Sequence, residues 1–178
     1  MARSRRRCLP LWFSRHPRAL CELKLPRFKW RYDSILSQIA SSLTLKGHTV
    51  HADLPNFRYS LPSFLSAQSL RPDIVLLSET EITFLELTVP FEGNFQAAQD
   101  RKATKYAHLL DLAKTNGFVA RLSCFEVGSR GLTSASWERF VKEFGLGAAL
   151  KKSILETAIR CSYVIWTTRF LPWENPPS

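Results

Sequence analysis

Apolar residues recur along the chain at two spacings, and each spacing predicts a different kind of element. From about Asp33 to Leu45 they recur at helical spacing, and Gly47 follows as a helix stop. The same spacing predicts a helix from about Phe95 to Thr115, ended by Asn116-Gly117. Two more helices are expected near the end of the chain, over residues 134–144 and 148–166.

Strands are predicted where β-branched and aromatic residues form short runs, over residues 49–54, 73–78, 82–89 and 118–127. The second and third runs form a hairpin whose turn is Glu79-Thr80-Glu81, and Pro90 ends it. Residues 56–70 contain prolines and serines and are expected to be a loop. This element order predicts an α/β fold with a mixed central sheet flanked by helices.

Length and composition favour one globular domain preceded by an arm. The 178 residues are 45% hydrophobic, which is enough for a substantial core. The longest apolar runs are too short to cross a membrane, and no secretion signal is found. The four cysteines are far apart and are read as reduced thiols of an intracellular protein. We expect an irregular arm at 1–29, a folded domain at 30–173 and a frayed tail at 174–178.

Positive charge is concentrated in the arm. The net charge is +10, yet residues 1–31 hold ten of the 25 basic residues and Glu22 as their one acidic residue. Such an arm favours nucleic-acid phosphates, and its first candidates for DNA or RNA binding are Arg5, Arg6, Arg7, Arg15 and Arg18. Anionic membranes attract a basic arm by the same physics, and a solvated tail or a nuclear-import signal at residues 5–7 explains the charges equally well.

Asp73 and Glu86 are the candidate metal ligands, because they lie on the two strands of the predicted hairpin. A hairpin centred on Thr80 places Asp73 opposite Leu87, so that Glu86 is expected to be its diagonal neighbour. Mg²⁺ binds one or two carboxylates together with water and substrate phosphates, and it can activate water for attack on a phosphodiester. The alternative is a surface aspartate and a glutamate paired with a neighbouring helix.

The following helix carries basic residues that could serve such a metal centre. Lys102 and Tyr106 share one face, and Lys105 lies beside them. A lysine aimed at the carboxylates would stabilise a hydroxide or the charge on the scissile phosphate. A solvated, charged helix face would have the same spacing.

These residues, taken in order, resemble the restriction-endonuclease-like domain of site-specific non-LTR retrotransposons, which belongs to the PD-(D/E)XK nucleases. The resemblance covers about residues 28–173 and rests on segments that begin with Trp30-Arg31-Tyr32-Asp33, where Tyr32 replaces the histidine of an Arg-His-Asp element. The other segments are 52–55, Arg71-Pro72-Asp73-Ile74-Val75, 85–92, Arg101-Lys102-x-x-Lys105-Tyr106 and 127–131.

The resemblance implies a restriction-endonuclease-like core that nicks target DNA in the nucleus to prime reverse transcription. It implies that Asp73 and Glu86 bind Mg²⁺ or Mn²⁺, that Lys102 is catalytic with Lys105 as the competing assignment, and that Tyr106, Asp33 and Arg31 are accessory. Thr88 stands where the standard motif has lysine, as expected if the lysine has moved to the helix.

Such domains follow a zinc knuckle, and only part of that pattern is present. Cys8, His16 and Cys21 keep the spacing of the last three ligands, but Arg5 replaces the first cysteine. Structural zinc takes four ligands, so zinc is not expected. A catalytically inactive DNA-binding remnant is therefore the alternative to an active nuclease. A small protein whose arm binds RNA or acidic partners is a third reading.

Overall fold

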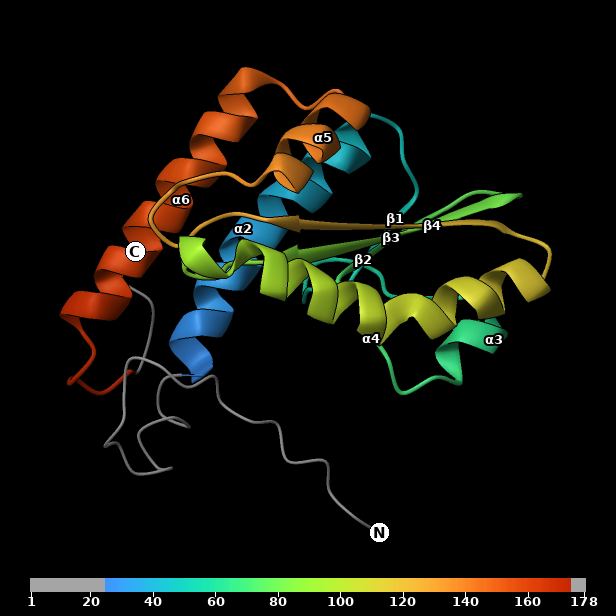
Figure 1. Cartoon of the computed structure of the whole chain (residues 1–178), viewed down its shortest axis with the longest axis horizontal. Coiled ribbons are helices and arrows are strands. Elements are labelled where there is room, and N and C mark those ends of the chain that lie inside the picture. Colours follow the sequence, from blue (N-terminus) through green and yellow to red (C-terminus); the bar gives the residue numbers. More distant parts are fainter. Residues whose placement is uncertain (1–24, 174–178) are drawn as a thin grey trace, which may run out of the picture.

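The structure, a computed structural model, describes residues 25–173. The elements in chain order are α2 (Leu25–Leu45), β1 (Val50–Ala52), α3 (Ser63–Ser66), β2 (Ile74–Leu77), β3 (Glu81–Thr88), η1 (Glu92–Asn94), α4 (Phe95–Thr115), β4 (Val119–Glu126), α5 (Ala135–Glu143) and α6 (Ala148–Thr167). Helices α2, α5 and α6 lie on one side of the sheet, and α4 with the short α3 lies on the other (Figure 1). The expected α/β class is confirmed.

The central sheet has four strands in the order β1-β2-β3-β4. The first three strands are antiparallel, whereas β3 and β4 run parallel and are connected through α4. A parallel pair needs such a long crossover, and the predicted helix supplies it. The expectation of a mixed sheet flanked by helices is confirmed.

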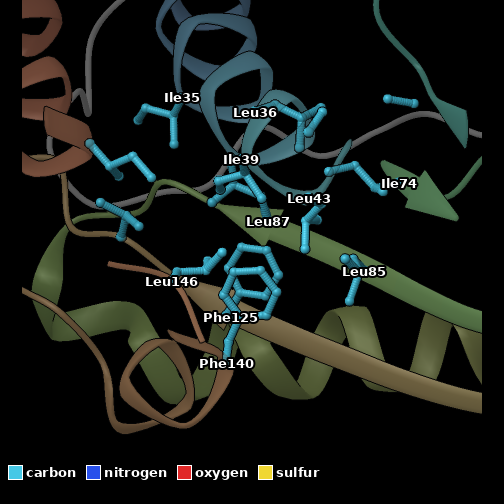
Figure 2. Packing of buried hydrophobic residues seen from close by; sticks show 14 of the residues in the cluster. Ile35, Leu36, Ile39, Leu43, Ile74, Leu85, Leu87, Phe125, Phe140 and Leu146 are labelled. Carbon is cyan, nitrogen blue, oxygen red and sulfur yellow. The ribbon is translucent and has the colours of Figure 1, made fainter. Parts of the chain in front are cut away.

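The main core lies between the sheet and the helices α2, α5 and α6. Ile35, Leu36, Ile39 and Leu43 of α2 are buried against Leu85, Leu87 and Phe125 of the sheet (Figure 2). The Phe125 and Phe140 rings stack at 3.9 Å. A smaller cluster on the other face of the sheet joins Val75, Ile82 and Phe84 to Tyr106 and Leu109 of α4.

Helix α2 begins earlier than the sequence predicted. It starts at Leu25, so residues 25–29 are helical and not part of an irregular arm. Pro26 is its second residue, and proline is tolerated in the first turn because the amide it lacks has no partner inside the helix. The expected stops are confirmed, since Gly47 and Gly117 both have φ of 86°.

Two short elements also differ from the sequence prediction. Strand β1 covers residues 50–52 and not 49–54, and the predicted loop at 56–70 contains the single-turn helix α3. β1 is an edge strand, whereas α3 buries Leu65 in the smaller cluster on the α4 side of the sheet. Within residues 25–173, no helix has the length and apolar character that a membrane span requires.

The hairpin register is shifted by one residue from our expectation. Ile74 pairs with Leu85 and Leu77 with Ile82, so the position before β2 faces Glu86, and Leu87 is not the partner of Asp73. The turn has two residues, Glu79 and Thr80, and the amide of Ser78 donates to the carbonyl of Glu81 at 2.9 Å. The expected diagonal arrangement is therefore wrong. Because a one-residue slip exchanges the two faces of a strand, the observed register is what puts both carboxylates on the same face.

Candidate functional site

The carboxylate pair lies on the α4 side of the sheet. Glu86 is fully buried in β3 between Leu85 and Leu87, which point into the main core on the other face. Asp73 precedes β2, directly across the hairpin. The Asp73 amide donates to Oε1 of Glu86 at 3.0 Å, and the Leu87 amide donates to Oδ2 of Asp73 at 2.9 Å. Both carboxylates are thus held by the hairpin backbone.

Lys102 of α4 contacts both carboxylates. Its Nζ lies 2.5 Å from Oε2 of Glu86 and 3.2 Å from Oδ2 of Asp73. It can reach them because it shares the sheet-facing side of α4 with the buried residues Ala98 and Tyr106, one turn away on either side. The neighbouring Lys105 contacts a different group, since its Nζ donates to the Tyr106 hydroxyl at 2.6 Å. Of the two lysines proposed from the sequence, the geometry brings Lys102 to the pair.

The contacts at this centre change the pKa values of Glu86 and Lys102. Burial, reinforced by the charge of Asp73, raises the pKa of Glu86 to about 8, although Lys102 opposes this shift. Burial alone would lower the pKa of Lys102, but the two carboxylates outweigh it and raise that pKa above its ordinary value. Two carboxylates therefore share a single ammonium, so the centre holds an excess of negative charge that a further cation or a proton can neutralise.

Tyr32 brings an unsatisfied hydroxyl to the same place. Burial first, and then the nearby charge of Asp73, raise the pKa of Tyr32 well above its ordinary value. Its hydroxyl is buried and makes no hydrogen bond of normal geometry within residues 25–173. A buried polar group without a partner is costly, so this hydroxyl fits beside a centre where a bound water or ion would complete its contacts.

The sequence analysis noted Tyr32 as a replacement for histidine and gave it no role. A signal was present, since Tyr32 lies three and four residues before Ile35 and Leu36 and so belongs to the buried side of α2. Cys124 was also missed as a neighbour of the site. It lies beside Glu86 in the parallel β3–β4 register, and burial with that carboxylate raises the pKa of its thiol to about 12.

Tyr106 supports the site from α4. It is buried, and its hydroxyl donates to the Arg71 carbonyl at 3.0 Å while accepting from Lys105. Burial and the charges of Glu86 and Asp73 raise the pKa of Tyr106, so it remains a donor at neutral pH. It thereby fixes the segment just before Asp73.

Arg31 and Asp33 are not brought to the carboxylates. The Arg31 guanidinium is buried and donates to Ser162 Oγ at 2.8 Å and to the Val89 carbonyl at 3.1 Å, which ties α2 to α6 and to the end of β3. Burial lowers the pKa of Arg31 to about 10. Asp33 pairs with Lys29 at 2.6 Å. Asp33 also lines a groove of about 460 Å³ between the start of α2 and residues 54–57.

The donor set fits a hard cation with few protein ligands. Within residues 25–173 no group of three or more His, Cys, Asp and Glu side chains surrounds one point. Two carboxylates are nevertheless enough for Mg²⁺, which keeps several waters and takes substrate phosphate oxygens as further ligands. The orphaned Tyr32 hydroxyl is suited to contact such a water.

Two predicted sets of residues lie outside the described part of the chain. They are the basic arm residues Arg5, Arg6, Arg7, Arg15 and Arg18, and the incomplete zinc pattern Cys8, His16 and Cys21. Comparison with known proteins adds no assignment, since no protein-family model matches the chain and no curated protein matches it either.

Proposed function

We propose that this chain is a divalent-metal-dependent DNA endonuclease with a restriction-endonuclease-like core. The observation that carries the proposal is the contact of Lys102 with both Asp73 and Glu86. Two carboxylates and a lysine that converge from a hairpin and the following helix are the groups needed to hold a metal and to neutralise a reacting phosphate. The α/β sheet with helices on both sides is compatible with that core, and the ordered motifs of the sequence resemble it.

Each residue has a defined part in this proposal. Asp73 and Glu86 would hold Mg²⁺ or Mn²⁺, and the bound ion would supply Lewis-acid activation of water and of the phosphodiester. Lys102 would stabilise the negative charge that grows on the attacked phosphate, or the attacking hydroxide. Tyr32 would orient water beside Asp73. Tyr106 would fix the backbone before Asp73, and so keep the aspartate in place.

The resemblance extends the proposal to the biological substrate. It implies nicking of nuclear target DNA, so that the new 3′ end primes reverse transcription of a retrotransposon. The excess of basic residues in positions 1–31 supports a nucleic-acid partner, through attraction to phosphates. RNA is a further candidate for the basic arm.

One observation favours the alternative of an inactive DNA-binding remnant. Lys102 already contacts both carboxylates, so each of them has a cationic partner in the absence of metal. Thr88, at the position of the standard lysine, is uncharged. Its buried hydroxyl has no hydrogen-bond partner inside the described residues.

Plasmid nicking distinguishes these functions. Supercoiled plasmid is incubated with the full chain and Mg²⁺ or Mn²⁺, and the wild type is compared with Asp73→Asn and Glu86→Gln. Glu79→Gln is the matched control, because Glu79 lies in the turn at the far end of the same hairpin. We expect nicking by the wild type and the control, and none by the two site variants. Nicking that survives Asp73→Asn would overturn the metal site, and DNA binding without nicking by the wild type would favour the remnant.

A further inference from the structure

Arg71 lies beside the carboxylate centre with its guanidinium held in one direction. Its side chain is 58% exposed, and its Nη2 lies 2.9 Å from Oδ1 of Asp53. The guanidinium also stacks over the Tyr59 ring at 4.6 Å. A guanidinium has five N–H donors, so the bond to Asp53 leaves others directed at solvent. An exposed cation with restricted motion is a favourable phosphate ligand, because less side-chain entropy is lost on binding.

The Tyr59 ring, over which Arg71 stacks, is itself held by a hydrogen bond. Tyr59 donates its hydroxyl proton to the Pro72 carbonyl at 2.9 Å, one residue before Asp73. Burial, with the charge of Asp53, raises the pKa of Tyr59, so the hydroxyl keeps that proton at neutral pH. The position of Arg71 is therefore tied to the same backbone segment that positions the candidate metal ligand.

Lys105 is held on the other side of this segment in a similar way. Its Nζ lies 4.3 Å from the centroid of the Tyr106 ring and donates to the Tyr106 hydroxyl. That hydroxyl in turn donates to the Arg71 carbonyl. Arg71 and Lys105 are thus linked through one tyrosine, and both are exposed.

A third cation held on an aromatic ring lies where β3 and β4 end. The Arg130 guanidinium stacks over the Phe91 ring at 4.4 Å, and its Nε lies 2.8 Å from Oε2 of Glu92. The Arg130 side chain is 63% exposed, whereas that of Glu92 is 7% exposed, so the carboxylate acts as a fixed support. The Ser129 amide donates to the Pro90 carbonyl at 2.9 Å, which joins the two loops.

All three cations lie at one edge of the sheet. Asp73 directly precedes β2 at this edge, and the parallel strands β3 and β4 both end there. Arg121 provides a contrast near the opposite edge, where its Nη2 lies 3.5 Å from Oε1 of Glu81. Its exposure, 57%, is close to that of Arg71, but no ring contact of Arg121 is found within residues 25–173. Arg71, Lys105 and Arg130 are thus each held on an aromatic ring, whereas Arg121 is held by an ion pair with Glu81.

We infer that Arg71, Lys105 and Arg130 form phosphate-binding subsites that take the DNA backbone on either side of the scissile phosphodiester. The inference rests on the proposed endonuclease function and adds the substrate contacts to it. The centre itself offers a polyanion no net positive charge, because Lys102 is already paired with Asp73 and Glu86. Attraction must therefore come from flanking cations. Fixed cations at this edge supply that attraction and set the register of the backbone over the carboxylates.

Salt dependence of DNA binding tests the subsites separately from cleavage. The full-length protein is titrated into a labelled 20-base-pair duplex in EDTA at several salt concentrations. Arg71→Gln, Lys105→Gln and Arg130→Gln are each compared with the wild type, and Arg121→Gln is the control of equal charge change. Each lost phosphate contact should reduce the slope of log K against log [salt] by about 0.9. We expect that reduction for the three subsite variants and an unchanged slope for Arg121→Gln.

Single-turnover nicking supplies the second measurement. The three variants should need several-fold more DNA to reach half-maximal rate, while the rate at saturating DNA stays close to that of the wild type. The subsites would be overturned if the three variants had the same salt-dependence slope as Arg121→Gln. They would also be overturned if the variants lost nicking rate at saturating DNA but needed no more DNA to reach half-maximal rate. If the slopes are unchanged but Asp73→Asn abolishes nicking, only the subsites fail. If Asp73→Asn still nicks, the proposed function fails, and absence of any duplex binding overturns both.

Discussion

Asp73 and Glu86 face each other across the β2–β3 hairpin, and the amide of Asp73 donates a hydrogen bond of 3.0 Å to Oε1 of Glu86. The amide of Leu87 completes the arrangement by donating to Oδ2 of Asp73. Main-chain donors therefore orient both carboxylates, so their separation is set by the sheet and not by side-chain rotamers. A centre held in this way is organised before any substrate arrives.

Removing the Lys102 ammonium should affect nicking far more than folding. Lys102→Met is expected to lower the nicking rate by about 100-fold or more, as for loss of a group that stabilises transition-state charge. The free energy of unfolding should fall by only about 1–3 kcal/mol, because Glu86 can accept a proton when its partner is lost. Plasmid nicking and urea unfolding measure the two effects.

Lys114→Met is the control for Lys102→Met, because Lys114 lies exposed in the last turn of the same helix. A drop in saturated nicking rate as large for Lys105→Met as for Lys102→Met would contradict the assignment of the lysine.

The stability of the metal-free protein should fall as pH rises through the range in which Glu86 titrates. Its pKa is about 8 in the folded chain and 4.5 as a reference for the unfolded chain. Between these values the folded state keeps a proton that the unfolded state has released, so the free energy of unfolding decreases with increasing pH. Thermal melts in EDTA from pH 5 to 8 should show this decrease for the wild type relative to Glu86→Gln. A relative stability that stays constant from pH 5 to 8 would mean that Lys102 keeps Glu86 ionised in the folded chain, and would contradict the raised pKa.

Tyr32→Phe should separate metal-linked function from folding. The hydroxyl is buried without a hydrogen-bond partner among the described residues, so its removal should change the free energy of unfolding by less than about 1 kcal/mol. Nicking at limiting Mg²⁺ should nevertheless fall, and should recover when Mg²⁺ is raised. Urea unfolding and a Mg²⁺ titration of the nicking rate measure the two responses. A large loss of stability with an unchanged Mg²⁺ dependence would assign the hydroxyl a structural role.

Arg31→Met should destabilise the fold without a selective effect on the site. The change removes two charged hydrogen bonds that join α2 to Ser162 and to the Val89 carbonyl, each worth about 1.5–3 kcal/mol. Urea unfolding should show the loss, while nicking by the folded fraction should keep its Mg²⁺ dependence. Arg160→Met, an exposed arginine on α6, is the control. A shifted Mg²⁺ dependence in Arg31→Met would restore the accessory role that the sequence suggested.

The spacing of apolar residues was sufficient to predict the long helices and strands, but not the pairing register of the β2–β3 hairpin. Helix α4 matches its predicted bounds because Gly117 and the buried Tyr106 and Leu109 define its end and its inner face. The hairpin strands were also recognisable, but the sequence assigned three residues to the turn and the structure has two. Glu81 decided this difference, since its backbone pairs with Ser78 in the ladder although its side chain is typical of a turn.

The candidate site was predictable as a set of residue types, and only partly as an arrangement. Asp73 and Glu86 were identified from their places on the predicted hairpin, and Glu86 also because a lone buried carboxylate is costly. Lys102 was identified from its spacing on the following helix and from the family resemblance. The choice between Lys102 and Lys105 depends on which side of α4 faces the carboxylates. The spacing of nearby residues along the helix does not determine this. The contacts of Arg31 were not predictable, because its partners, Ser162 and Val89, are 131 and 58 residues away in sequence.

The two-residue turn at Glu79-Thr80 determines where related chains can gain or lose residues. An insertion within the turn would lengthen the loop and leave every cross-strand pair in place. One extra residue within 74–77 or 82–85 would instead rotate one carboxylate into the apolar layer beneath α2, unless a bulge absorbed it. Chains that share this centre can therefore differ in the number of residues between their two acids, provided that the difference is confined to the tip of the hairpin.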